Sequence, residues 1–228
     1  MPAHPTVVLF DIDGTLIDCG GAGRRAMEDA YRAIAPEREP PRFPFGGGTD
    51  RAIARRYLTS AELPDDDVSI ERFLDTYLRH LSAQLRASVG YRVHAGAVDL
   101  LDELVAHDRV AIGLGTGNVE AGARKKLAVG ALDARFAFGG FGCDHEVRAE
   151  LIRRGAQRGA ARLGRELDAC RVVVIGDTER DVEAAHAIGA TCVGVATGSC
   201  SADVLRAAGA DHIVDTLTDP TVRRAIEV

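Results

Sequence analysis

Tryptophan is absent from this sequence of 228 residues, and aromatic residues make up only 5% of it. Aromatic side chains are the usual platforms for stacking nucleic-acid bases, so their scarcity argues against such a partner. The net charge of −6 also gives no bulk attraction for a phosphate backbone. No apolar run is long enough for a membrane span, and the N-terminal residues lack the basic and apolar regions of a signal peptide. We therefore expect neither a nucleic-acid partner nor a membrane partner.

Cysteine is also sparse, and its distribution indicates neither a zinc site nor a disulfide framework. The expected state is that of reduced cysteines in a cytoplasmic protein. The remaining composition, 46% hydrophobic and 27% charged, is that of an ordinary globular chain with one large domain or one domain with an insert. The five cysteines, none in a Cys-x-x-Cys pair, are Cys19, Cys143, Cys170, Cys192 and Cys200.

The clearest pattern is F-D-I-D-G-T-L-I-D, from Phe10 to Asp18, which continues the apolar run 7–10. A short apolar run bounded by a turn signal predicts a strand buried on both faces. Asp11 and Asp13 follow two residues apart, so in an extended chain they point to the same side. Two such carboxylates repel each other unless a cation lies between them. Mg²⁺ is the obvious candidate, because it binds carboxylates, water and phosphate oxygens. The alternative is an ordinary strand end with an Asp-Gly turn.

Apolar and β-branched segments alternate with helical patterns over most of the chain. This alternation predicts parallel β-α-β units with right-handed crossovers. We therefore expect an α/β fold with a doubly wound parallel sheet, whose ligands bind at the carboxyl ends of the strands. After the first run, the predicted strands are 110–114, 135–138, 171–175, 191–195 and 212–214.

Residues 18–92 contain only helical patterns, and links that contain glycine bound them. We expect an all-helical cap domain here, inserted into an α/β catalytic core formed by residues 1–17 and 93–228. Asp50 is a candidate cap for one of its helices. The run of three aspartates at 65–67 is predicted to be a solvated helix start, which the helix dipole favours.

A second strand end carries Thr116, Gly117 and Asn118, which are predicted to open a helix. A helix N-terminus presents free N–H groups and a positive dipole end, both of which suit a phosphate group. Thr116 adds a hydroxyl donor. Asn118 can also be interpreted as a plain N-cap, which is compatible with the first interpretation.

A further strand end carries Asp177, with Asp181 four residues later. Thr178 and Asp181 fit a variant capping box, which could explain Asp181 without a metal. It does not explain Asp177, which ends a strongly apolar strand.

A cation is also needed against a transferred phosphoryl group. Arg148, near the start of a helix predicted over 146–164, is one choice. Lys125 and Lys126 are the others, but they lie in the middle of a predicted helix and are expected on its solvated face.

The three motifs D-I-D-G-T, L-G-T-G-N and I-G-D-T-E-R-D together resemble the haloacid-dehalogenase superfamily of Mg²⁺-dependent phosphotransferases. They are most similar to its phosphoglycolate-phosphatase-like members, which carry a helical cap after the first motif. The resemblance covers essentially the whole chain and implies a Rossmann-like core.

The resemblance also implies a role for each motif residue. Asp11 would be the nucleophile that forms an aspartyl-phosphate, and Asp13 the general acid and then the general base. Thr116, with the N–H groups of Gly117 and Asn118, would bind the phosphoryl oxygens. The metal ligands implied for Mg²⁺ are Asp11, the backbone carbonyl of Asp13, Asp177 and, in an outer position, Asp181.

The sequence departs from the family pattern at two places. Relatives usually carry a lysine as the third motif, and here Arg148 is assigned to phosphate binding in its place. In the cap, relatives often have an arginine before Thr-Asp, whereas this chain has Gly48 before Thr49. We therefore expect weaker recognition of an anionic tail such as that of phosphoglycolate.

The leading hypothesis is a phosphomonoester hydrolase that acts on a small phosphorylated metabolite, as a monomer or homodimer. A sugar-phosphate mutase of the same superfamily needs the same core, and a catalytically silent binding module is the alternative from another class. C–halogen hydrolysis is disfavoured because it has no use for Asp13 or for metal bound at Asp177. C–P hydrolysis would need a cap lysine to form a Schiff base, and residues 18–94 contain none.

Overall fold

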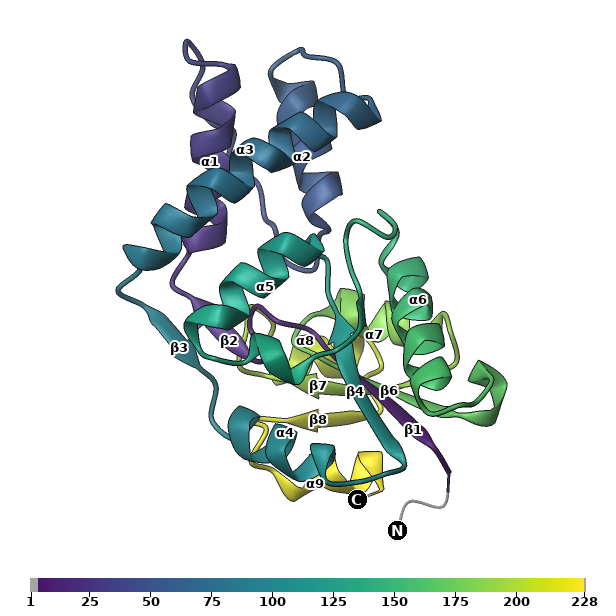
Figure 1. The fold of residues 1–228 in the computed structure, drawn as a ribbon. Coiled ribbons are helices and arrows are strands. Elements are labelled where there is room, and N and C mark those ends of the chain that lie inside the picture. Colours follow the sequence, from purple (N-terminus) through teal and green to yellow (C-terminus); the bar gives the residue numbers. More distant parts are fainter. Residues whose placement is uncertain (1–3, 228) are drawn as a thin grey trace.

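The computed structural model describes residues 4–227. Its centre is a sheet of six parallel strands in the order β5-β4-β1-β6-β7-β8, with helices on both faces (Figure 1). This architecture confirms the predicted α/β fold with a doubly wound parallel sheet. The strands are β1 (Thr6–Phe10), β4 (Val110–Gly115), β5 (Gly139–Gly140), β6 (Arg171–Gly176), β7 (Thr191–Val195) and β8 (His212–Val214).

The central strand β1 is buried on both faces because its side chains alternate between two hydrophobic clusters. Val7 and Leu9 belong to one cluster, while Val8 and Phe10 belong to the other. This alternation explains the unbroken apolar run in the sequence. Helices α6 (Arg148–Arg162), α7 (Glu179–His186) and α8 (Ala202–Ala207) cover the first face, and α4 (Ala97–Val105), α5 (Glu120–Val129) and α9 (Pro220–Ile226) cover the second.

The pairing of β1 with β6 brings two distant sequence motifs together. The strands are parallel, and Phe10 lies opposite Ile175. The Asp11 N–H then donates to the Ile175 carbonyl oxygen at 2.9 Å, which continues the ladder by one residue. Asp11 and Asp177 therefore leave the sheet at the same edge.

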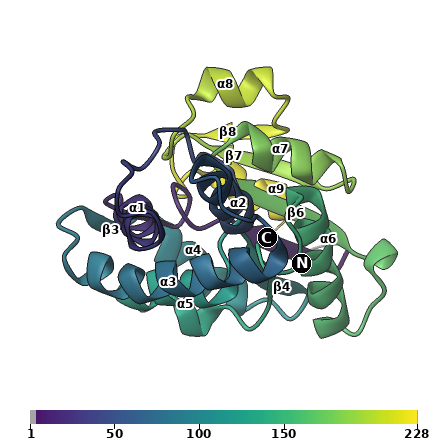
Figure 2. The ribbon, with the colours of Figure 1, turned by 90° about the horizontal axis from the view of Figure 1, so that it is seen from above.

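Three further helices gather at one end of the molecule, above the core in Figure 1, and Figure 2 shows them over the core from above. They are α1 (Ala22–Ile34), α2 (Asp50–Ser60) and α3 (Asp67–Arg86). The acidic start of α3 is exposed, as the sequence predicted. Asp66 is its N-cap and accepts the Ser69 N–H at 2.9 Å.

The expectation of only helical structure in residues 18–92 is wrong at both ends of that segment. Strand β2 (Ile17–Cys19) pairs antiparallel with β3 (Tyr91–Val93) to form a separate two-stranded ribbon. Each strand is only three residues long, so neither has enough alternation for a sequence pattern to show. The ribbon therefore pairs the segment that leads from the core into α1 with the segment that returns from α3 to the core.

The strand predicted at 135–138 is also wrong. Asp133–Arg135 form a 3₁₀ helix, and the strand is Gly139–Gly140 instead. Glycine is needed here because α6 packs directly on this edge strand: a Cβ on Gly140 would lie 1.7 Å from the Leu151 carbonyl oxygen. Paired glycines normally indicate a turn, so the sequence could not indicate this strand.

No helix within residues 4–227 has the length and apolar character required to cross a bilayer.

Candidate active site

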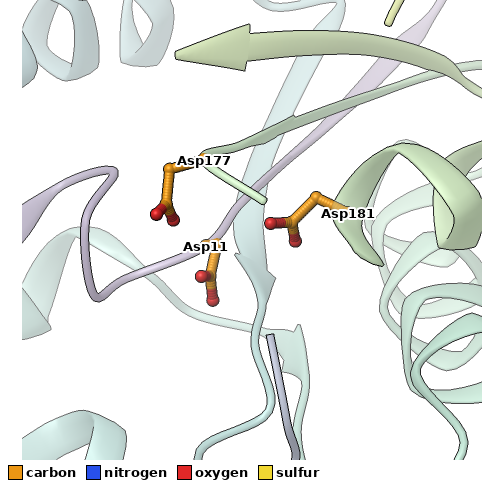
Figure 3. Close-up of side chains that lie close together, drawn as sticks. All are labelled: Asp11, Asp177 and Asp181. Carbon is orange, nitrogen blue, oxygen red and sulfur yellow. The ribbon is translucent and has the colours of Figure 1, made fainter. Parts of the chain in front are cut away.

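Three buried carboxylates converge where β1 and β6 end (Figure 3). Asp11 follows β1, Asp177 follows β6, and Asp181 lies in the first turn of α7. One oxygen from each carboxylate lies within 4.8 Å of the others. The parallel register of β1 and β6 places Asp11 next to Asp177. Helix α7 starts just after β6 and carries Asp181 to the same point. The predicted grouping of Asp11, Asp177 and Asp181 is therefore present.

Burial and the neighbouring carboxylates raise the pKa values of Asp177 and Asp11. Burial, together with the Asp11 and Asp181 charges, raises the pKa of Asp177 to about 8, and the Ser199 N–H and Arg148 oppose this shift. Burial also raises the pKa of Asp11 to about 6, with Arg148 opposing the shift and Asp181 and Asp13 adding to it. A site that holds unfavourable negative charge in this way favours a cation or a proton.

Arg148 is the cation that the structure places inside this group. Its Nη2 lies 3.1 Å from Asp11 Oδ1 and 2.6 Å from Asp181 Oδ1, and all three side chains are buried. Its Nε also donates to Asp181 Oδ1 at 3.0 Å. Three carboxylates and one guanidinium give a formal charge of −2 when all are ionised. That remaining charge matches one divalent cation.

Asp181 has a structural role as well. Its Oδ2 accepts the Thr178 backbone N–H at 3.1 Å and the Thr178 hydroxyl at 2.7 Å, completing the capping box of α7. The capping box predicted from the sequence is therefore confirmed. One oxygen therefore caps the helix while the other contacts Arg148, so the capping role is compatible with a position beside Asp11 and Asp177.

Asp13 points to a different set of partners. Its Oδ2 accepts hydrogen bonds from Lys126 Nζ at 2.6 Å and from Asn118 Nδ2 at 2.9 Å. Burial opposes ionisation of Asp13, but Lys126 and Asn118 outweigh it and hold its pKa below the usual value. The Asp13 carboxylate is thus kept ionised beside the Asp11 group without belonging to it.

The prediction that Lys126 lies on a solvated face is wrong, whereas the same prediction for Lys125 is confirmed. Lys126 is 5% exposed and donates a second hydrogen bond to Asn118 Oδ1 at 2.6 Å. Consecutive residues of a helix point about 100° apart, so two adjacent lysines cannot share one face. The exposed Lys125 instead donates to Ser82 at 2.8 Å. Burial lowers the pKa of Lys126, but Asp13, with Tyr77, Cys19 and Asp50, holds it well above its usual value.

The Thr116–Asn118 loop lies beside this group, but it does not cap α5. The helix begins at Glu120 with Val119 as its N-cap, so the interpretation of Asn118 as an N-cap is wrong. Asn118 instead donates from Nδ2 to Thr116 Oγ1 at 2.9 Å, and its backbone N–H also reaches that oxygen at 3.3 Å. The loop is thereby curled tightly at the carboxyl end of β4.

Asp50, from the insert, contacts the backbone immediately before α5. Its Oδ2 accepts the Val119 N–H at 2.9 Å, and its own N–H donates to the Gly117 carbonyl oxygen at 2.8 Å. Thr49, not Asp50, is the N-cap of α2. Burial raises the pKa of Asp50 to about 6. Because Asp50 contacts the N-cap residue of α5 from more than 60 positions earlier, rules of local sequence could not find this contact.

Two glycines bring the backbone directly against Asp177. A Cβ on Gly198 would lie 1.7 Å from Asp177 Oδ2, and one on Gly14, where φ is +90°, would lie 2.4 Å from the same oxygen. The Ser199 N–H donates to that oxygen at 3.1 Å. The Asp177 side chain is therefore fixed by backbone on two sides.

The insert helices close over the site and leave a cavity of about 410 Å³. The loop before α2 makes the closest contacts: the Gly47 carbonyl oxygen accepts Arg148 Nη1 at 3.2 Å, and the Thr49 hydroxyl donates to the Glu146 carbonyl oxygen at 3.2 Å. Arg55 adds a two-point ion pair to the Glu146 carboxylate, each contact at 3.1 Å. The cavity is lined from below by Asp11, Asp13, Thr116, Asn118, Lys126, Arg148 and Asp177, and from the insert by Arg24, Met27, Phe45, Asp50, Ile53 and Tyr77.

Comparison with known proteins places this geometry in context. A family model for haloacid dehalogenase-like hydrolases matches residues 5–189. The protein named "Probable phosphatase IndB" of Dickeya dadantii (strain 3937) is 26% identical over 216 residues, which are 93% of this chain and 90% of that protein.

Solved structures agree in fold across the whole chain. A predicted phosphatase from Clostridium acetobutylicum superposes with a TM-score of 0.72 at 21% identity, over 99% of this chain and all of the other. CbbY from Rhodobacter sphaeroides, solved in complex with phosphate, gives a TM-score of 0.75 at 16% identity, over 99% of this chain and 100% of the other. At these identities the likeness establishes the fold alone.

Proposed function

This chain belongs to the haloacid dehalogenase-like hydrolase family, and from that premise we propose that it is a Mg²⁺-dependent hydrolase of small phosphomonoesters that works through an aspartyl-phosphate on Asp11. The observation that supports this most is the buried group of Asp11, Asp177 and Asp181 around Arg148. Asp13 stands beside this group with its own lysine partner.

The residues present fit a magnesium ion. Carboxylate oxygens are the ligands that Mg²⁺ prefers, and the group is left with a charge of −2 by its single arginine. Burial and like charges raise the pKa values of Asp177 and Asp11, and a cation bound between them would offset both effects. We propose that Asp11, Asp177, the Asp13 backbone carbonyl and, through an outer position, Asp181 would hold the ion. When bound, Mg²⁺ would offset the negative charge of the phosphoryl group and of the carboxylates that face it.

In the first chemical step, an oxygen of the Asp11 carboxylate attacks phosphorus, and the bond to the leaving alkoxide oxygen breaks. Asp13 donates the proton that the leaving oxygen needs. Lys126 keeps Asp13 ionised in the empty site, so the proton must be taken up with the substrate. The dianionic phosphoryl group raises the pKa of Asp13 by like-charge repulsion and thereby favours that uptake.

In the second step, Asp13 accepts a proton from a water molecule that attacks the phosphorus of the aspartyl-phosphate. The bond between phosphorus and the Asp11 oxygen breaks, and inorganic phosphate is released. Throughout both steps, Thr116 and the backbone N–H groups of Gly117 and Asn118 orient the phosphoryl oxygens, and Arg148 binds them as a charged donor.

We propose that residues 18–92 form a cap domain on a core of residues 1–17 and 93–228, and that the cap acts as a lid. The contacts of Gly47 with Arg148 and of Arg55 with Glu146 fix the closed arrangement. Closure excludes bulk water, which strengthens the charge interactions around Asp11 and protects the acyl-phosphate from premature hydrolysis.

The proposal is tested by phosphate release from p-nitrophenyl phosphate and a panel of phosphorylated metabolites. We expect turnover that requires added Mg²⁺ and disappears with a chelator. Conversion of a hexose 1-phosphate to its 6-phosphate without free phosphate would instead identify a mutase. If the protein binds these phosphates but turns none of them over, it is a silent binding module.

Magnesium binding is expected to become weaker as the pH falls. Because the pKa of Asp177 is raised to about 8, this carboxyl is largely protonated near neutrality in the metal-free protein, and binding must release its proton. The apparent dissociation constant should therefore rise about tenfold for each pH unit between about 8 and 6, and more steeply below 6, where Asp11 also takes up a proton.

Calorimetric titration of the metal-free protein with Mg²⁺ measures this linkage. Titrations at one pH in buffers of different ionisation enthalpy give the number of protons released, which should be close to one near pH 7. An affinity that stays constant between pH 6 and 8, with no proton release, would mean that Asp177 does not bind the ion.

A further inference from the structure

The half of the cavity that faces the insert helices has its own chemistry, which the reaction at Asp11 does not use. Three apolar side chains line it together with Arg24, Asp50 and Tyr77; they are Met27, Phe45 and Ile53. This is the side on which the part of the substrate beyond the phosphoryl group must lie, because the catalytic carboxylates occupy the other side. Arg24 therefore sits where it can distinguish one leaving group from another.

Arg24 differs from the other cations that line this cavity, which are Arg92, Lys126 and Arg148. Each of those three has a carboxylate within ion-pair distance. For Arg24 there is none among residues 4–227. The three pairs are Arg92 with Asp18 at 2.7 Å, Lys126 with Asp13 at 2.6 Å, and Arg148 with Asp11 and Asp181 at 3.1 and 2.6 Å.

The guanidinium of Arg24 is nevertheless held in place. Its Nη1 donates to the Phe43 carbonyl oxygen at 3.0 Å, and its Cζ lies 3.9 Å from the centre of the Phe45 ring. Phe43 in turn packs on Tyr57, with ring centres 4.9 Å apart. An arginine fixed by an aromatic face and one carbonyl loses little freedom when it binds a ligand. It has five N–H donors and uses one of them here.

We propose that Arg24 binds a second anionic group on the substrate, a carboxylate or a second phosphate. The substrate would then be a phosphomonoester with a negative charge at the far end of a short carbon skeleton, of a size that a cavity of about 410 Å³ accommodates. The apolar side chains beside Arg24 exclude water and strengthen such a charge-assisted contact. This inference rests on the proposed function, since it assigns the substrate class of the same site.

Two matched pairs of substrates test the inference. 3-Phosphoglycerate carries a carboxylate where glycerol 3-phosphate carries a hydroxymethyl group, and fructose 1,6-bisphosphate carries one more phosphate than fructose 6-phosphate. We expect the protein to prefer the more charged member of at least one pair, as judged by kcat/KM with Mg²⁺. The pair that responds tells whether the group bound is a carboxylate or a phosphate.

The preference should depend on Arg24. In Arg24→Met, the ratio of kcat/KM values within the responding pair should fall about tenfold or more, mainly through KM. Arg24→Lys keeps a charge without the planar donors and should retain part of the preference. Arg32→Met is the matched control, because Arg32 lies on the same helix and pairs with Asp29 on the surface. It should leave the ratio unchanged.

A binding measurement separates this inference from the proposed reaction. Calorimetry on Asp11→Asn, with and without Arg24→Met, gives dissociation constants without turnover. Tighter binding of the charged member that is lost with Arg24→Met supports the inference even if no phosphate is ever released. Phosphate release by the natural protein with no preference in either pair, or with a preference that Arg24→Met leaves intact, overturns the inference and leaves the hydrolase proposal standing.

Discussion

Replacing Asp11 with asparagine should abolish Mg²⁺-dependent phosphate release from p-nitrophenyl phosphate. The amide cannot supply the anionic oxygen that attacks phosphorus, and no other carboxylate takes that position at the end of β1. Losing the nucleophile of a covalent mechanism costs about four to six orders of magnitude in kcat, so the residual rate should be close to background. Initial rates at saturating Mg²⁺ measure this directly.

The loss should not come from unfolding. Burial and neighbouring carboxylates penalise the charged form of Asp11 and raise its pKa to about 6, so a neutral amide relieves a penalty that grows as the pH rises from about 4 through 6. Metal-free Asp11→Asn should therefore be at least as stable as the natural protein at pH 8 in urea unfolding. Asp99→Asn, an exposed change on α4, is the control and should retain full activity. Comparable phosphate release by Asp11→Asn would rule out the aspartyl-phosphate.

The part of the site that the sequence revealed is the part fixed by strand ends. Asp11 and Asp177 each follow a strongly apolar strand, and the parallel pairing of β1 with β6 places the two aspartates next to each other. The motif order also identified the family correctly. Asp181 was ambiguous between a helix cap and a metal ligand, and its two oxygens contact the cap residue Thr178 and Arg148. No pattern of spacing separates two surroundings that one side chain contacts at once.

The part that the sequence did not reveal comes from contacts between segments far apart in the chain. Asp50 of the insert accepts the Val119 N–H just before α5, and the ribbon of β2 and β3 joins segments more than 70 residues apart. Local propensity carries no information about such pairs. Gly139 and Gly140 resemble a turn because close packing, not strand propensity, requires glycine: α6 approaches Gly140, and Leu114 and Phe141 approach Gly139.

Lys126 was misassigned for a related reason, although one signal was available. The chain has 28 lysines and arginines in all, and only two are lysine, side by side at 125 and 126. On a helix, one of two adjacent residues can face the core while the other faces water. Solvation is the usual state of lysine, and the Asp13 carboxylate that pairs with Lys126 comes close to it only once β1 and α5 are placed together.

Replacing Lys126 with methionine should destabilise the protein strongly. The change keeps the apolar stem but removes a buried ammonium with two hydrogen bonds. Asp13 loses its cationic partner and keeps the Asn118 Nδ2 donor, while Asn118 Oδ1 loses its donor. Removing one partner of a buried ion pair typically costs 3–5 kcal/mol, and because the Asp13 side chain is 42% exposed we expect the lower end, about 3 kcal/mol. Lys125→Met is the matched control and should change the free energy of unfolding by less than about 0.5 kcal/mol.

The pH dependence of this difference identifies the ion pair as its cause. The pKa of Asp13 is lowered in the folded protein, so its contribution is present above its unfolded value of about 4 and is lost as the pH falls through the folded value. The pKa of Lys126 is raised, so its contribution is present below about pH 10 and is lost as the pH rises through the folded value.

The free energies of unfolding in urea of the two methionine variants should therefore differ most between about pH 5 and 10 and converge at lower pH. A gap that persists unchanged below pH 4 would mean that Lys126 acts through packing rather than through its charge, and equal stabilities at pH 7 would mean that Asp13 does not depend on it.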